Sequence, residues 1–393
     1  MRMRGNEIVI GVAGAGTMGA GIAQAAAASE HPVILFDVSK SALDTSLTRI
    51  EESVNRRYER QQISNEQRRS LLSRLEMTSS LEKLSECSLV IEAIFEDLQT
   101  KRELLKRLEE VVRADCTLGT NTSSLSVTSI SSVLQIRDRF LGTHFFNPAA
   151  IMPLVELVRT DATSERALAN ARETIEGWGK LTITLPDTPG FIVNRVARPF
   201  YLEALKMLEE GVADIATIDW AMRECKGFKM GPFELMDLIG NDVNYAVSES
   251  IFTSFYYVPR FRPSYVQRQL VQAGNLGRKT GKGFYDYGGH ASKLQPTKDA
   301  KLAEEIGCRI LFMIFNEAAD AVFHRIASPA DIDRAMVKAV NYPRGPLLWA
   351  DEIGISEIVH GLEALQSDFG DDRYRPNPLL KRMMKSGETF YQP

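Results

Sequence analysis

The chain has 393 residues, of which 44% are hydrophobic and 25% are charged, a composition that suits two or three globular domains and excludes a wholly disordered protein. Its formal net charge of −4 argues against a nucleic-acid partner, which needs a basic face. The four cysteines are widely spaced and form no CxxC pair, so we expect no metal site and a cytoplasmic protein.

Short apolar runs alternate with longer amphipathic runs over about the first 185 residues. The pattern predicts strands at 8–13, 33–36, 89–93, 117–120, 140–143 and 154–158, with helices at 18–28, 40–57, 101–112 and 164–178. This alternation is typical of a Rossmann-type α/β domain with a doubly wound, mostly parallel sheet. The uncharged stretch 8–29 imitates a membrane span, but it is rich in glycine and poor in leucine, so we expect no membrane segment.

From Asp187 onward only helical periodicity remains, and this part contains an internal repeat. The segment 218–222 (IDWAM) matches 332–336 (IDRAM) at an offset of 114 residues. The same offset joins Gly231-Pro232 with Gly345-Pro346, Asp237 with Asp351, and Gly240 with Gly354. Such matches predict two tandem all-α domains. The predicted domains are therefore 1–186, 187–290 and 291–393.

A glycine-rich turn lies between the first predicted strand and helix. It reads Gly14-Ala15-Gly16-Thr17-Met18-Gly19, a GxGxxG fingerprint whose glycines permit a tight turn, a close approach to a pyrophosphate and close helix–strand packing. Asp37 ends the next predicted strand, 18 residues after Gly19, where an acid accepts hydrogen bonds from the adenosine ribose. Because a carboxylate repels a 2′-phosphate, NAD is predicted rather than NADP, with FAD as the alternative.

Two polar segments follow predicted strands and should line the ligand crevice. The first, 120–124, contains Asn121 and Ser123, and the second, 143–148, contains His144. A histidine there can accept a hydroxyl proton while hydride leaves the neighbouring carbon. Glu156 lies in an apolar run, where an acid needs a partner, so we predict that it orients His144. A histidine with a purely structural role is the alternative.

Several motifs together resemble the L-3-hydroxyacyl-CoA dehydrogenase family. In chain order they are GAGTMGAGIAQ from Gly14, Ile91-Glu92-Ala93, NTSSL, HFFNP, LVELV, Gly190-Phe191-Ile192-Val193-Asn194-Arg195, GPFEL from Gly231 and GKGFY from Gly281. The resemblance covers about residues 7–288. It implies reversible oxidation of (3S)-3-hydroxyacyl-CoA to 3-oxoacyl-CoA with NAD, as in fatty acid β-oxidation. The segments 341–346 and 372–376 more weakly resemble two-module members that act on 3-hydroxyadipyl-CoA.

The resemblance also implies roles for individual residues. His144 matches the catalytic base, Glu156 its orienting acid, and Ser123 and Asn194 the residues that hold the reacting oxygen. The residues implied to line the NAD site, besides the glycine-rich turn and Asp37, are Ala93, Glu96, Lys101, Asn121, Ser123 and Asn147. Arg56 and Arg57 are candidates for contacts with coenzyme A, although family members often carry lysines there and a solvated helix face is the alternative.

Two other interpretations stay open: a non-catalytic NAD-binding protein like the family's lens structural members, and a β-hydroxyacid dehydrogenase with a catalytic lysine. The offset of 114 pairs Asn194 with Cys308 and finds no counterpart of the loop 281–284, so one active site per chain is expected. We expect the second helical domain to replace the surface that shorter members bury by dimerising, which gives a monomer, with a homodimer as the alternative.

Overall fold

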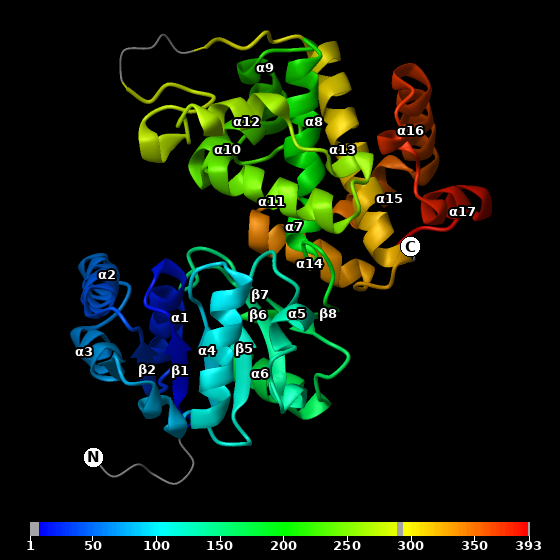
Figure 1. Cartoon of the computed structure of the whole chain (residues 1–393). Coiled ribbons are helices and arrows are strands. Elements are labelled where there is room, and N and C mark those ends of the chain that lie inside the picture. The colour runs from blue at the N-terminus through cyan, green and yellow to red at the C-terminus, as the bar shows by residue number, and fades with distance from the viewer. Residues whose placement is uncertain (1–7, 289–293, 392–393) are drawn as a thin grey trace. The chain divides into compact units, whose positions relative to one another are not determined.

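The computed structural model describes residues 8–288 and 294–391. The chain separates into a first compact unit that ends at Thr188 and a second that begins at Pro189 (Figure 1). The predicted boundary between 290 and 291 lies outside the described residues, and the division into three domains stays a prediction. Within the described residues, no helix is both long and apolar enough to cross a lipid bilayer.

The described part of the first unit is built on an eight-stranded sheet of order β3-β2-β1-β4-β5-β6-β7-β8. Neighbouring strands are parallel, except that β6 and β7 are antiparallel. The strand order reverses between β1 and β4, the kind of switch point at which doubly wound sheets bind ligands. The predicted Rossmann-type sheet is confirmed. The strands are β1 (Ile10–Ala13), β2 (Val33–Phe36), β3 (Leu75–Thr78), β4 (Leu89–Glu92), β5 (Thr117–Thr120), β6 (Phe140–Phe145), β7 (Leu154–Arg159) and β8 (Leu181–Pro186).

Most helices of this unit begin where a short polar side chain caps them. Ser39, Ser64, Asp97 and Ser164 each accept a hydrogen bond from the backbone N–H three residues later. The cap at Asp97 starts α4 at Leu98, earlier than the predicted residue 101. The helices are α1 (Thr17–Ala28), α2 (Lys40–Glu59), α3 (Asn65–Ser73), α4 (Leu98–Val111), α5 (Val127–Ser131) and α6 (Glu165–Gly177).

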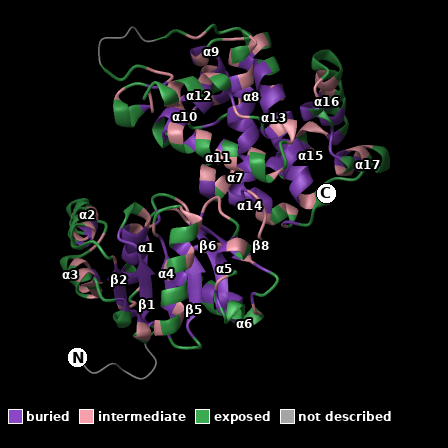
Figure 2. Cartoon of the chain, in the orientation of Figure 1, coloured by how far each residue is buried: buried purple, intermediate pink, exposed green. Residues whose placement is uncertain are grey.

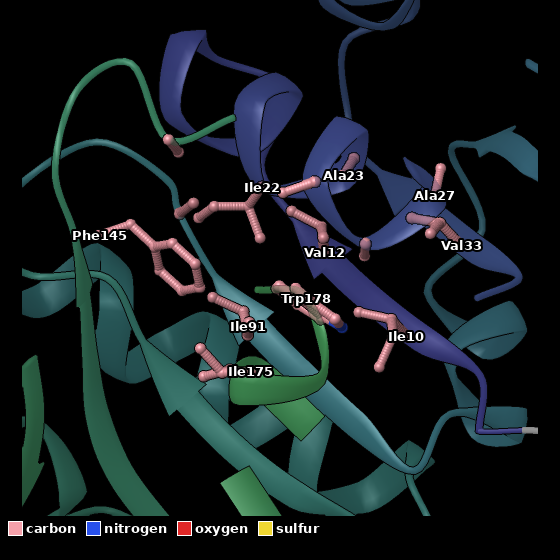
Figure 3. Packing of buried hydrophobic residues seen from close by; sticks show 14 of the residues in the cluster. Ile10, Val12, Ile22, Ala23, Ala27, Val33, Ile91, Phe145, Ile175 and Trp178 are labelled. Atoms are coloured by element: carbon pink, nitrogen blue, oxygen red, sulfur yellow. The ribbon is translucent and has the colours of Figure 1, made fainter. Parts of the chain in front are cut away.

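One face of the sheet carries a hydrophobic core shared with α1 and α6. Ile91 of β4 and Phe145 of β6 belong to this core, together with residues of both helices (Figure 3). Successive residues of a strand point to opposite faces of the sheet. Glu92 and His144, which are the neighbours of Ile91 and Phe145, therefore point away from this core, although both are buried.

The prediction for this unit misses four elements and misplaces one residue. The edge strands β3 and β8 and the short helices α3 and α5 were not predicted. His144 was expected in a loop after a strand ending at residue 143. It lies instead within β6, which continues through Phe145 because that part of the strand pairs with β7.

The described part of the second unit is helical, and α8 and α13 form its buried centre (Figure 2). The starts of α10, α11 and α12 correspond along the sequence to those of α15, α16 and α17, at offsets of 114, 114 and 113 residues. The helices are α7 (Val193–Val196), α8 (Arg198–Glu209), α9 (Ile215–Trp220), α10 (Pro232–Ile239), α11 (Asn241–Ser254), α12 (Tyr265–Gln272), α13 (Ala300–Phe323), α14 (Pro329–Val340), α15 (Pro346–Ile353), α16 (Ile355–Phe369) and α17 (Pro378–Ser386).

Hydrogen bonds inside this unit repeat as well. Asp219 accepts a hydrogen bond from the hydroxyl of Tyr285 at 2.8 Å, and Asp333 accepts one from Tyr391 at 2.8 Å. Each aspartate also binds N–H groups at the start of the following helix, α10 or α15. The backbone N–H groups of Phe284 and Tyr285 bind Asp237, and those of Phe390 and Tyr391 bind Asp351 in the same way. The expectation that the second half lacks any counterpart of the loop 281–284 is therefore wrong at Phe284, the last residue of that loop. Tyr391 follows Tyr285 by 106 residues rather than 114, so a fixed offset missed it.

Candidate active site

The glycine-rich turn connects β1 to α1 and leaves no room for a side chain at Gly14 or Gly19. Gly14 has a φ of +115°, and a Cβ on it would lie 2.6 Å from the carbonyl oxygen of Ala93. A Cβ on Gly19 would lie 1.8 Å from the carbonyl oxygen of Gly14, whereas at Gly16 it would meet no described atom within 4 Å. Among the described residues, no side chain caps α1. The turn therefore has space and N–H groups that fit a dinucleotide pyrophosphate.

Asp37 follows β2 directly and lies against this turn. Its Oδ2 accepts a hydrogen bond from the backbone N–H of Ala15 at 2.8 Å, and its Oδ1 accepts one from Ser39 at 2.9 Å. Each carboxylate oxygen has a second lone pair. The carboxylate can thus hold the turn and still accept hydrogen bonds from ribose hydroxyls.

Thr17 and Met18 begin α1. Met18 packs against the hydrophobic core, and the Thr17 hydroxyl accepts a hydrogen bond from the guanidinium of Arg49 at 3.1 Å. Arg49 comes from α2 and places a cation beside the helix N-terminus, where phosphates would bind. The sequence pattern alone does not indicate this contact.

Lys101 and Glu96 belong to a charge cluster in which Lys101 and Glu92 are buried and Glu96 is partly exposed to solvent. The Lys101 Nζ lies 2.7 Å from Oε1 of Glu92 and 3.3 Å from Oε2 of Glu96. Glu92 ends β4, is fully buried, and accepts a hydrogen bond from the Thr120 hydroxyl at 2.5 Å. Sequence reasoning gave Glu92 no role, although an acid within an apolar strand is the same signal that singled out Glu156.

Glu96 fixes the loop that follows β5. Its Oε1 accepts hydrogen bonds from the Thr122 hydroxyl at 2.7 Å and from the backbone N–H of Ser123 at 2.9 Å. Burial alone raises the pKa of Glu96, but Lys101 and these hydrogen bonds outweigh burial and hold the pKa below its ordinary value. An ionised carboxylate therefore positions the backbone that carries Ser123.

His144 and Glu156 face each other across the antiparallel pair of β6 and β7. The His144 Nδ1 lies 2.7 Å from Oε2 of Glu156, and the two residues are 5% and 0% exposed. An ionised carboxylate only accepts hydrogen bonds, so Nδ1 donates and Nε2 becomes the acceptor nitrogen. The ring of Phe146 packs 4.4 Å from the imidazole, centroid to centroid. This arrangement suits proton transfer by the imidazole.

The carboxyl ends of parallel strands bring the predicted residues of the first unit to one edge of the sheet. Gly14 follows β1 closely, Asp37 follows β2, Ala93 follows β4 and Asn121 follows β5. The Asn121 Oδ1 accepts a hydrogen bond from the backbone N–H of Phe145 at 2.9 Å, which ties the loop after β5 to the end of β6. Asn147 lies just beyond this point, exposed to solvent.

The remaining predicted residues lie on helices. Arg56 and Arg57 lie in the last turn of α2, where Arg56 forms an exposed ion pair with Glu52 at 3.7 Å. Asn194 lies in α7 of the second unit, and its carbonyl oxygen accepts a hydrogen bond from Arg198 Nε at 3.2 Å. Within the described residues, no group of three or more His, Cys, Asp and Glu side chains could hold a metal ion.

Two family models match the chain. The model described as 3-hydroxyacyl-CoA dehydrogenase, NAD binding domain, matches residues 9–188. The model described as 3-hydroxyacyl-CoA dehydrogenase, C-terminal domain, matches residues 190–287 and 306–391.

Individual proteins match as well. The 3-hydroxyadipyl-CoA dehydrogenase of Escherichia coli K12 is 37% identical, and the match covers 97% of this chain and 99% of that protein. The mitochondrial hydroxyacyl-coenzyme A dehydrogenase of the pig, Sus scrofa, is 39% identical over 70% of this chain and 90% of its own length. A crystal structure of 3-hydroxybutyryl-CoA dehydrogenase from Escherichia coli K12 superposes with a TM-score of 0.91 at 36% identity, over 97% of this chain and 99% of that one.

Proposed function

Because the chain belongs to the 3-hydroxyacyl-CoA dehydrogenase family and is an NAD-dependent enzyme of that kind, we propose that His144 is its general base and Glu156 the acid that orients it. The observation that carries this proposal is the buried contact of 2.7 Å between the two side chains. The match to an NAD binding domain, and to dehydrogenases along nearly the whole chain, argues against the FAD, lysine-dependent and non-catalytic interpretations.

The reaction needs one acceptor for the proton of the 3-hydroxyl and another for the hydride on C3. NAD supplies the second when bound, by accepting the hydride from C3 of the substrate. His144 Nε2 takes the proton of the 3-hydroxyl, and Glu156 stabilises the imidazolium that forms. In the reverse direction the imidazolium returns the proton. Ser123 and Asn194 are assigned the role of holding the reacting oxygen, as the family resemblance implies.

The nucleotide-binding residues divide into two groups. Gly14, Gly16, Thr17, Met18 and Gly19 form the turn that would receive the pyrophosphate, and Asp37 would bind the adenosine ribose. Ala93, Glu96, Asn121, Ser123 and Asn147 would surround the nicotinamide half. We assign Lys101 an indirect role through Glu96, since its ammonium group is fully buried between two carboxylates.

The acyl group is proposed to be dicarboxylic, as in 3-hydroxyadipyl-CoA, with Arg56 and Arg57 near the coenzyme A phosphates. The relative named for that substrate supports this choice. We expect kcat/KM for 3-oxoadipyl-CoA to exceed that for acetoacetyl-CoA by about 10–100-fold. This factor corresponds to the free energy of one or two hydrogen bonds to the terminal carboxylate of the substrate. Consumption of NADH measures both rates. Equal rates contradict the dicarboxylic preference, and no NADH consumption with any acyl-CoA contradicts the catalytic proposal.

We propose that the protein is a cytoplasmic monomer with two helical copies, 187–290 and 291–393, the second in the place of a partner subunit. The repeated match of the C-terminal family model and the repeated contacts of Asp219 and Asp333 support two copies. Sedimentation velocity should show single chains at micromolar concentration. An obligate dimer that forms through residues 187–290 would contradict this proposal.

A further inference from the structure

The second unit contains a buried ion-pair network beside the substrate asparagine proposed above. Arg195, the residue after Asn194, places its Nε 2.5 Å from Oε1 of Glu317 and its Nη2 2.5 Å from Oδ2 of Asp320. Arg260 Nη1 lies 3.1 Å from the other oxygen of Glu317. The Arg195 and Glu317 side chains are almost wholly buried. We call these four charged residues, Arg195, Arg260, Glu317 and Asp320, the first network.

A second network has the same composition at its centre. Arg309 Nε lies 3.2 Å from Oε2 of Glu203, and Arg373 Nη2 lies 2.8 Å from Oε1 of the same carboxylate. The Tyr374 hydroxyl also donates to Glu203, at 3.1 Å. The side chains of Glu203, Arg309 and Arg373 are buried, as are those of Glu317 and Arg195 in the first network, whereas Arg260 is partly exposed. We call Glu203, Arg309, Arg373 and Tyr374 the second network.

The two networks correspond residue by residue and are crossed between the copies. The repeat pairs Arg195 with Arg309, Glu203 with Glu317 and Arg260 with Arg373, at offsets of 114, 114 and 113 residues. In the first network, arginines of the first copy bind the glutamate of the second copy. In the second network, arginines of the second copy bind the glutamate of the first. Such reciprocal contacts are the mark of a two-fold interface, here within one chain.

The networks differ in what lies next to them. Arg195 follows Asn194, whereas its counterpart Arg309 follows Cys308. The backbone N–H of Arg195 also donates to the carbonyl of Gly190 at 3.1 Å, so both the backbone and the side chain of Arg195 are anchored. The guanidinium further lies 4.9 Å from the centre of the Phe255 ring. Only the first network, therefore, holds the turn that carries the proposed substrate residue.

We propose that Glu317, contributed by the second helical copy, is a positioning residue for the reaction: by binding Arg195 it holds the backbone that presents Asn194 to the substrate. The second copy then serves catalysis although it lacks a substrate asparagine of its own. This inference rests on the proposed role of Asn194. Its physical basis is the planar guanidinium of Arg195, which binds Glu317 through one nitrogen and Asp320 through another. Because both contacts fix the side chain, the backbone of α7 next to Asn194 has little conformational freedom.

Glu317→Gln tests the proposal, and Glu203→Gln is its matched control, because it removes the equivalent buried charge from the second network. Both variants should lose thermal stability to a similar degree. We expect Glu317→Gln to lower kcat/KM with acetoacetyl-CoA by about 10–100-fold, as misplacement of a substrate-holding group does. Glu203→Gln should leave kcat/KM near that of the unaltered enzyme.

An Asn194→Ala background separates positioning from a general structural effect. If Glu317 acts through Asn194, the loss caused by Glu317→Gln should disappear in that background. A loss that persists there, or an equal loss from Glu203→Gln, overturns the positioning role. Full activity of Asn194→Ala alone overturns the proposed role of Asn194 and this inference with it. If Glu317→Gln does not fold, Arg195→Lys and its counterpart Arg309→Lys repeat the comparison with the charge retained and the fork removed.

Discussion

Replacement of His144 by alanine should lower kcat with acetoacetyl-CoA and NADH by about 10²–10⁴-fold, the usual contribution of a general acid or base. The variant also leaves Glu156 buried opposite a methyl group, which destabilises the sheet. His144→Gln keeps a polar amide in place of the imidazole and has no basic nitrogen. Both variants should bind NADH normally, as measured by fluorescence titration, while turnover falls.

The role of Glu156 can be isolated in the same experiment. Glu156→Gln should lower kcat in the unaltered enzyme but cost nothing further in the His144→Gln background, because the carboxylate acts through the imidazole. His360→Ala serves as the control, since that histidine is exposed on α16. Substantial activity in His144→Gln would contradict the assignment of the base. An additional loss from Glu156→Gln in that background would show that the glutamate has a separate role.

Gly16→Ala and Gly19→Ala should separate nucleotide binding from folding. A methyl group on Gly19 would lie 1.8 Å from the Gly14 carbonyl oxygen, so we expect destabilisation by about 3 kcal/mol or more as α1 is pushed from β1. Gly16→Ala meets no described atom within 4 Å and should change stability by at most about 1 kcal/mol. Its methyl group would fill space intended for the pyrophosphate, so the Kd for NADH should rise about 10–100-fold.

Gly177→Ala, at the end of α6, is the control for both changes, because no described atom lies within 4 Å of its added methyl group either. It should leave the affinity for NADH unchanged and raise the free energy of unfolding in urea by at most about 1 kcal/mol, since alanine is favoured over glycine in a helix. Normal NADH affinity in Gly16→Ala would show that the pyrophosphate does not approach this residue. Normal stability in Gly19→Ala would show that the contact between α1 and β1 can relax.

Periodicity was enough to predict the central strands but not the edges of the sheet. Strands β1, β2 and β4 are buried along their whole length, so their mostly apolar runs are easily found. The edge strand β3 contains Glu76 and has no fully buried residue, which leaves little pattern. The other edge strand, β8, does alternate: Ile183 and Leu185 are buried, whereas Thr182 and Thr184 are partly exposed. This alternation indicates a strand, although none was predicted there.

The candidate site was predictable where a charged residue lay in an otherwise apolar segment. Glu156 was found because a carboxylate inside an apolar strand needs a partner. The same argument applies to Glu92, whose partner Lys101 had been assigned to the nucleotide instead. The crossing of Arg195 to Glu317 could not be foreseen, since the repeat aligns the two copies but does not indicate that each arginine binds the other copy's glutamate.

The crossed networks also affect how the sequence of such a protein can evolve. In a symmetric pair of identical subunits, a single codon specifies both ends of the interface, and a substitution that damages one catalytic centre damages its twin. Here separate codons encode residues 194 and 308. Cysteine at 308 therefore leaves Asn194 intact, and positions of the second copy that do not hold the Asn194 turn, unlike Glu317, can be substituted without loss of turnover.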